Sequence, residues 1–273
     1  MTETAPAAHR RSTGLLARIL SSLVMIPLAL AAVWIGAPFL PALVMLAGAG
    51  MGWEWARLLR AGPASLCLII AAPFVAAAAA TVGDGAAAVV IAAIFAAVLA
   101  LVERRGVRRL WAALGMLWIA LSCVAILWLD HGQSGRADIF FLLALVWASD
   151  IGAYACGRAI GGPKLAPGLS PNKTWAGAVG GLVCALLVGL AAAHLAHANA
   201  MRVIVVAAIV AVAAQLGDLG ESSAKRHFGV KDSGALIPGH GGLLDRLDSL
   251  LAAAMVLAAC VAAIGPDLLR NAP

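Results

Sequence analysis

The stretch AAAVVIAAIFAAVLALV (Ala86–Val102) decides the fold class, because none of its side chains is charged or polar. An α-helix needs roughly 20 predominantly apolar residues to cross the hydrocarbon core of a bilayer. Runs of similar length and composition recur along the whole chain. The stretch therefore predicts one of several membrane-spanning helices.

The composition of the whole chain agrees with this prediction. Of the 273 residues, 63% are hydrophobic and 12% are charged, and the mean hydropathy is +0.98. A soluble domain carries about 25% charged residues and is about half apolar. So little polar surface excludes a soluble globule, and we predict an all-α, polytopic transmembrane helical bundle.

Nine apolar runs can be separated by charges, glycines and prolines. Pro41 and Glu54 interrupt the second run, and Pro73 interrupts the third, so a count of eight also stays open. Basic residues precede the first run as in a signal peptide, but the length of the run and the spans that follow favour a retained helix. The nine predicted spans are Ile19–Ile35, Phe39–Trp55, Leu66–Thr81, Ala86–Val102, Leu110–Leu129, Ile139–Ala159, Trp175–His194, Val203–Leu219 and Leu250–Ile264.

Lysine and arginine predict the orientation of these spans. If the N-terminus is cytoplasmic and nine spans alternate, 16 of the 19 basic residues lie inside, and Arg136, Arg202 and Arg270 lie outside. Such a bias is what the positive-inside rule expects. We divide the chain into a polar basic tail (1–18), N-terminal transmembrane helices (19–135) and a C-terminal transmembrane catalytic region (136–273) with cytoplasmic loops 157–174 and 221–249.

The cysteines and the net charge indicate no separate function. The five cysteines are widely spaced in apolar runs without a C-x-x-C pair, so neither a zinc site nor a disulfide framework is expected. The net charge of +6 fits basic loops beside an anionic leaflet better than nucleic-acid binding. The cluster Arg104, Arg105, Arg108 and Arg109 is expected to set topology.

A few acidic residues lie in or beside the spans. Asp150 is late in the sixth run, and Asp218 and Glu221 share a helix face at the end of the eighth. Intramembrane acids usually serve function, although an ion pair with a loop lysine or arginine is the alternative. Glu54, with Arg57 three residues on and tryptophans on both sides, is interpreted as an interfacial anchor rather than a catalytic group.

The segment 217–249 is the densest polar stretch. Asp245 and Asp248 can project from one helix face and offer hard oxygens to a divalent cation such as Mg²⁺. The sequence Pro238-Gly239-His240-Gly241-Gly242 leads into the same helix, where backbone amides and the helix N-terminus favour an anion. Acids for a metal beside glycines and cations for phosphate predict phosphoryl or nucleotidyl transfer.

The other predicted inside loop adds cations and polar donors to the same face. It contains Gly161-Gly162-Pro163-Lys164 and Ser170-Pro171-Asn172-Lys173-Thr174. It is not a Walker A loop, because no Gly-Lys-Ser/Thr occurs at the required spacing.

Three ordered blocks resemble the phosphatidate cytidylyltransferase (CDP-diacylglycerol synthase) family. The first joins Asp150-x-x-Ala153-Tyr154 to Gly157-Arg158, and the second is Ser170-Pro171-Asn172-Lys173-Thr174. The third runs from Gly217-Asp218-x-x-Glu221-Ser222 through Lys225-Arg226, Lys231-Asp232 and Pro238-x-His240-Gly241-Gly242-x-x-Asp245-Arg246-x-Asp248. Two positions depart from the family pattern: Ala224 replaces a larger aliphatic residue, and Ala176 stands where the family commonly has Glu.

The resemblance implies transfer of CMP from CTP to phosphatidate, giving CDP-diacylglycerol and pyrophosphate. It implies Mg²⁺ on Asp218, Asp245 and Asp248, which are also the predicted catalytic residues, and it leaves a second cation open. Expected partners are CTP, phosphatidate and membrane lipids, without nucleic acid, and a homodimer by resemblance. The predicted substrate-binding residues are Lys225, Arg226, Lys231, Lys173, Ser170, Asn172, Ser222, His240, Gly241, Gly242 and Arg246, with His240 as an orienting donor rather than a base.

Alternative functions also stay open at this point. A CTP-dependent kinase of a lipid alcohol would attack the terminal phosphorus and would need a base. An ion-coupled transporter would use midplane acids and inverted repeats, whereas the acids here gather toward one face and no repeat is visible. An inactive homologue that keeps the fold is the remaining alternative.

Overall fold

The computed structural model describes residues 23–103, 106–237, 241–265 and 268–269. An apolar helix, Leu23–Ile35, comes first. The helices that follow are α2 (Phe39–Leu58), α3 (Pro63–Thr81), α4 (Gly85–Val102), α5 (Gly106–His131), α6 (Gly135–Ala159), α7 (Trp175–Leu195), α8 (Ala200–His227) and α9 (Leu244–Ile264). The predicted all-α bundle is thus confirmed.

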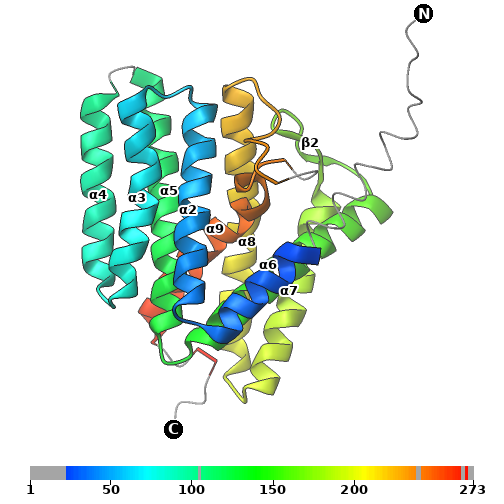
Figure 1. Cartoon of the computed structure of the whole chain (residues 1–273). Helices are drawn as coiled ribbons and strands as arrows, with labels where there is room; N and C mark the ends of the chain where they lie inside the picture. The colour runs from blue at the N-terminus through cyan, green and yellow to red at the C-terminus, as the bar shows by residue number, and fades with distance from the viewer. Residues whose placement is uncertain (1–22, 104–105, 238–240, 266–267, 270–273) are drawn as a thin grey trace, which may run out of the picture.

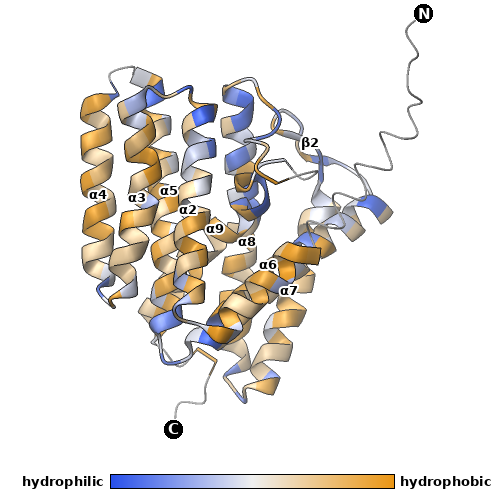
Figure 2. Ribbon diagram, viewed as in Figure 1, coloured by the Kyte–Doolittle hydropathy of each residue, from blue (hydrophilic) through white to orange (hydrophobic). Residues whose placement is uncertain are grey.

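Apolar side chains cover the middle of the bundle, and polar residues gather at its two ends (Figure 2). Among the described residues, seven helices, α3 to α9, are long and apolar enough to cross a membrane. The chain is therefore an integral membrane protein. The helix Leu23–Ile35 is shorter than a span, and α2 is not among the seven, so the count of nine stays a prediction.

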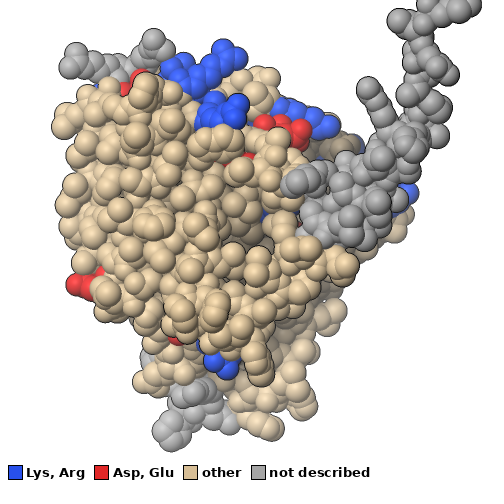
Figure 3. All heavy atoms as spheres, in the orientation of Figure 1, with Lys and Arg blue, Asp and Glu red and all other residues tan. Residues whose placement is uncertain are grey.

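The connections lie at two opposite ends of the bundle (Figure 1). The α2–α3, α4–α5, α6–α7 and α8–α9 connections, which sequence reasoning assigned to the inside, share one end, and the α3–α4, α5–α6 and α7–α8 connections share the other. Figure 3 shows lysine and arginine concentrated at the first end. This distribution fits the predicted alternation, while the side of the membrane stays a prediction.

The boundaries near the polar segment differ from those predicted. The helix α8 continues to His227, well beyond the predicted Leu219, and α9 begins at Leu244 rather than Leu250. An ion pair between Glu221 and Lys225, one turn apart, supports the added turns of α8. The polar connection is therefore 228–243, shorter than the predicted loop 221–249.

The α6–α7 connection contains a hairpin that sequence reasoning did not predict. Strands β1 (Lys164–Ala166) and β2 (Ser170–Thr174) pair antiparallel, with Lys164 opposite Thr174. The hairpin leads directly into α7, because the Thr174 hydroxyl accepts a hydrogen bond of 3.1 Å from the Gly177 amide and caps the helix. This short link holds Lys173 at a fixed place beside the ends of α6 and α8.

The α6–α7 pair is tilted relative to α2, α3, α4 and α5 (Figure 1), and small residues let its two backbones approach closely. A Cβ atom on Gly152 would lie 2.6 Å from Cys184 Sγ and 2.8 Å from the Gly180 carbonyl oxygen. Without a hydrophobic force between helices in lipid, such close packing carries much of the association. Because α6 carries Asp150 and the hairpin that leads into α7 carries Lys173, this contact also positions the site described below.

Gly152→Ala is expected to lower the free energy of unfolding in detergent micelles by about 1–3 kcal/mol, and so the melting temperature, because the added methyl overpacks the α6–α7 contact. Gly220→Ala on α8 is the matched control, since nothing lies within 4 Å of its Cβ position. Alanine is the better helix former by about 1 kcal/mol, so the control should melt at or above the wild-type temperature. Equal melting of both variants would contradict the packing role of Gly152.

Candidate active site

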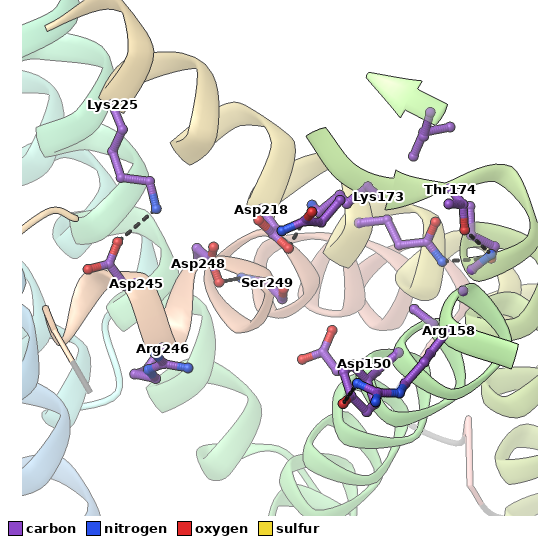
Figure 4. Close-up of a pocket in the computed structure, with 18 of the residues that line it drawn as sticks. Asp150, Arg158, Lys173, Thr174, Asp218, Lys225, Asp245, Arg246, Asp248 and Ser249 are labelled. Atoms are coloured by element: carbon purple, nitrogen blue, oxygen red, sulfur yellow. Dashed lines mark hydrogen bonds and ion pairs between the residues drawn. The ribbon is translucent and has the colours of Figure 1, made fainter. Parts of the chain in front are cut away.

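A cavity of about 820 Å³ opens at the end of the bundle that carries the α6–α7 and α8–α9 connections. Helices α6, α7, α8 and α9 and the β hairpin contribute its walls (Figure 4). All three motif blocks found in the sequence therefore meet in one place. The charged residues that line it are Asp150, Arg158, Lys173, Asp218, Lys225, Asp232, Asp245, Arg246 and Asp248.

Three carboxylates, Asp150, Asp218 and Asp248, come from α6, α8 and α9 and face the same space (Figure 4). Asp218 forms an ion pair of 2.6 Å with Lys173 and also lines the cavity, so the pair is present and the catalytic role of this acid stays a prediction. Asp248 is 8% exposed, and one of its oxygens accepts from the Ser249 amide at 2.7 Å. The charges of Asp150 and Asp248 each repel that of Asp218, so the cavity concentrates negative charge.

Lys225 joins α8 to α9 through two buried acids. Its ammonium group bonds to Glu221, which is 0% exposed, and lies 2.7 Å from Asp245 Oδ1 (Figure 4). Asp245 also accepts from the Ser233 amide at 3.0 Å and from the Gly242 amide at 2.9 Å. A carboxylate has about four lone-pair positions, so these donors leave Asp245 little capacity for a further ligand.

The chain's own carboxylates occupy the N-terminus of α9. Asp245 accepts a hydrogen bond from the Gly242 amide. Glu54 accepts hydrogen bonds from the amides of Leu243 and Leu244 at 3.0 and 2.9 Å. Gly241 and Gly242 do not line the cavity. They therefore stay predicted rather than observed phosphate ligands, and His240 lies outside the described residues.

The interpretation of Glu54 as an interfacial anchor paired with Arg57 is wrong. Glu54 is 0% exposed and bonds to the α9 N-terminus, whereas Arg57 stacks on the Trp53 ring with its guanidinium carbon 4.7 Å from the centroid. The two residues are three apart on α2, but Glu54 is buried against the start of α9 while Arg57 is exposed. Sequence spacing alone could not reveal this contact, since its partners are about 190 residues away.

Comparison with known proteins gives a family for this arrangement. The sequence model of the Cytidylyltransferase family matches residues 16–264. The chain belongs to this family. The match includes both halves of the bundle, so the N-terminal helices are part of the family fold and not an unrelated addition.

Among curated cytidylyltransferases, a phosphatidate cytidylyltransferase of Brucella suis biovar 1 (strain 1330) is 50% identical over 149 residues, which cover 54% of this chain and 55% of that protein. A phosphatidate cytidylyltransferase of Staphylococcus saprophyticus is 45% identical over 143 residues, which cover 51% of this chain and 55% of that protein. The chain thus matches about half the length of these relatives.

Some predicted substrate-binding residues lie in the cavity of this family member, and others lie outside it. Lys173, Asn172, Lys225 and Arg246 line it, as do the three predicted catalytic acids. Ser222 is buried in α8, Ser170 lies in β2, and Lys231 is exposed on the α8–α9 connection. Arg226 instead donates to the carbonyl oxygens of Leu169 and Val230, both at 3.2 Å, and so ties the hairpin to this connection.

Several further residues of the cavity were missing from the predicted site residues, with Tyr154, Arg158, Gln215 and Asp232 among them. Tyr154 and Arg158 follow Asp150 at four-residue intervals on α6, and Arg158 donates to the tyrosine hydroxyl at 3.3 Å. That spacing places all three on one helix face and was visible in the sequence. Gln215 and Asp232 carried no comparable signal, because one sits alone in an apolar run and the other in a connection.

The donor atoms of the cavity fit a magnesium ion that is completed by substrate. Among the described residues, no three His, Cys, Asp or Glu side chains come close enough to enclose a metal by themselves. Mg²⁺ is usually bound by one or two carboxylates plus waters and substrate phosphates. Asp218 and Asp248 offer such hard oxygens, and a cation beside them would offset their mutual repulsion.

Proposed function

We propose that this chain transfers CMP from CTP to phosphatidate and releases pyrophosphate, as a phosphatidate cytidylyltransferase. The observation that carries the proposal is the convergence of the three motif blocks on one cavity, together with membership of the cytidylyltransferase family. The names of the two relatives support the choice of phosphatidate as the acceptor.

The charge of the cavity supports an anionic, multiply charged substrate pair. Its cations, Arg158, Lys173, Lys225 and Arg246, come from α6, the hairpin, α8 and α9 and so surround the acids. Guanidinium and ammonium groups at different angles can hold a triphosphate and a lipid phosphate together. Holding both reactants in one geometry supplies much of the rate enhancement of such a transfer.

In the proposed reaction, an oxygen of the lipid phosphate attacks the α-phosphorus of CTP in line. A new P–O bond forms, the bond between the α-phosphorus and the bridging oxygen breaks, and the β and γ phosphates leave as pyrophosphate. Phosphatidate is already an anion near neutral pH, so the acceptor needs no general base. The residues of the chain bind, orient and neutralise, which is the main work in phosphoryl-type transfers.

Mg²⁺ is proposed on Asp218 and Asp248, where it would neutralise charge that develops on the phosphate oxygens. Lys173 is held by Asp218 at 2.6 Å and is placed to bind a phosphate beside that carboxylate. Asp245 is proposed chiefly to fix Lys225, since its oxygens already accept from Lys225, Ser233 and Gly242.

The proposed location of the active site is the cytoplasmic face. The basic residues gather at the end of the bundle that holds the cavity (Figure 3), and positive charge marks cytoplasmic loops. At this depth a lipid phosphate in the headgroup layer and a nucleotide in the cytosol can both reach the carboxylates.

The test compares two lipid acceptors with matched acyl chains, phosphatidate and diacylglycerol, each given to purified protein with CTP and Mg²⁺ in detergent micelles. The proposal expects a CDP-lipid and pyrophosphate with phosphatidate, and no product with diacylglycerol. A phosphorylated lipid and CDP from diacylglycerol would instead establish the kinase alternative. No product from either acceptor, with folded protein, would contradict the proposed function.

A further inference from the structure

Glu54 is the deeply buried acid of α2 that the proposed reaction does not use. Its carboxylate accepts from three groups of the α8–α9 segment, which are the amides of Leu243 and Leu244 and, at 3.4 Å, the hydroxyl of Ser233. Glycines make room for it, because a Cβ on Gly234 would overlap the Glu54 carboxylate and one on Gly242 would lie 2.8 Å from Oε2. The segment is thus shaped around this one side chain.

The need for this contact follows from the sequence at the start of α9. The N-cap residue is Leu243, which has no side-chain oxygen and makes no capping hydrogen bond. Helices normally satisfy their first amides with a local Ser, Thr, Asp or Asn. Here a carboxylate from α2 does so instead, and its negative charge also interacts favourably with the positive end of the helix dipole.

The contact continues into the cavity through a short series of bonds. Ser233, whose hydroxyl contacts Glu54, donates its amide to Asp245, and the Gly242 amide beside the capped residues donates to the same acid. Asp245 in turn holds Lys225, which lines the cavity. Glu54 therefore lies outside the cavity, and three hydrogen bonds, through Ser233 and Asp245, connect it to Lys225 inside.

We infer that Glu54 is a positioning residue: it fixes Ser233 and the start of α9 so that Asp245 and Lys225 hold their places in the cavity. The inference rests on the proposed function for its catalytic consequence, although its structural part stands separately. It also assigns a role to the N-terminal half of the chain, in which the sequence offered no motif. That half supplies the residue that caps the helix carrying Asp245 and Asp248.

The test uses Glu54→Gln, which keeps the size of the side chain but places an amide NH₂ group against a backbone N–H donor. The matched control is Glu103→Gln. Glu103 is a buried glutamate that accepts from Ser65 at 3.4 Å and makes no described contact with the α8–α9 segment. Two readouts are taken from full-length protein in micelles: hydrogen exchange by mass spectrometry, and the kinetics of CMP transfer per folded molecule.

Glu54→Gln is expected to speed amide exchange in 233–237 and 241–245 about tenfold or more without a change in α4. It is also expected to lower kcat by about 10–100-fold, the usual cost of losing a residue that orients a ligand group. The KM for CTP should change less than kcat, because the other cations of the cavity remain. Glu103→Gln should match the wild type in both readouts.

Unchanged exchange in 233–237 and 241–245, or activity lost only in proportion to the unfolded fraction, would overturn the inference. If wild-type protein transfers no CMP, the proposed function fails, and the exchange readout still decides whether Glu54 fixes the segment. Gly234→Ala disrupts the same contact without changing Glu54, since its methyl group would displace the Glu54 carboxylate. It is expected to reproduce both effects and replaces Glu54→Gln if that variant does not fold.

Discussion

Asp248→Asn is expected to lower CMP transfer by at least about 100-fold, the scale seen when a charge-stabilising group is removed from an active site. Asp248 lies at the wall of the cavity, where asparagine keeps the shape but removes the charge that attracts a cation. The same variant should not lose stability, because a carboxylate that is 8% exposed and repelled by Asp218 is costly to bury. The variant should therefore lose activity without losing stability.

Steady-state transfer rates and thermal unfolding in the same micelles check this prediction. Asp84→Asn is the control, since Asp84 caps α4 through the Ala87 amide at the opposite end of the bundle and asparagine caps helices equally well. The control should keep both activity and stability. An Asp248→Asn variant with near wild-type rates would remove this acid from the catalytic set.

Lys225→Met is expected to lower the free energy of unfolding by about 3–5 kcal/mol, because removing one partner of a buried ion pair leaves uncompensated charge. Two acids lose their cation at once: Glu221, which is 0% exposed, and Asp245, whose side chain is 9% exposed. Transfer should also fall, since the cavity loses one of its cations. Chemical or thermal unfolding in micelles measures the stability change.

Lys164→Met is the matched control, because Lys164 is an exposed residue of β1 that does not line the cavity. Adding Glu221→Gln to Lys225→Met removes one of the two carboxylates that lost their cation, so it should restore part of the stability. A double-mutant cycle measures this coupling. It should not restore transfer. If Lys225→Met alone unfolded like the wild type, the ion-pair network would not hold α8 to α9.

Sequence patterns predicted the membrane bundle and part of the cavity lining for a clear physical reason. Long apolar runs have few alternatives to helices in lipid, because every backbone amide must be satisfied internally. The acids Asp150, Asp218 and Asp248 were visible because charge is expensive at the ends of such runs. Their ordered motifs then indicated that the loop 157–174 lies on the same face as the polar segment before the last helix.

What the sequence did not reveal depends on contacts between distant residues. Glu54 looked like half of an i,i+3 pair with Arg57, and only the packing of α2 against α9 places it on the amides of Leu243 and Leu244. Arg226 looked like a phosphate ligand, but it bonds to two carbonyl oxygens of neighbouring connections. A local pattern gives the chemistry of a side chain, whereas its partner is set by the tertiary fold.

Transfer from doubly labelled CTP is the most direct measurement of the central claim. Purified protein in micelles would receive phosphatidate, Mg²⁺ and CTP that carries distinguishable labels on its α and γ phosphates. The account predicts the α label in the extracted lipid and the γ label in pyrophosphate. The γ label in the lipid, or neither label there with folded protein, would contradict it.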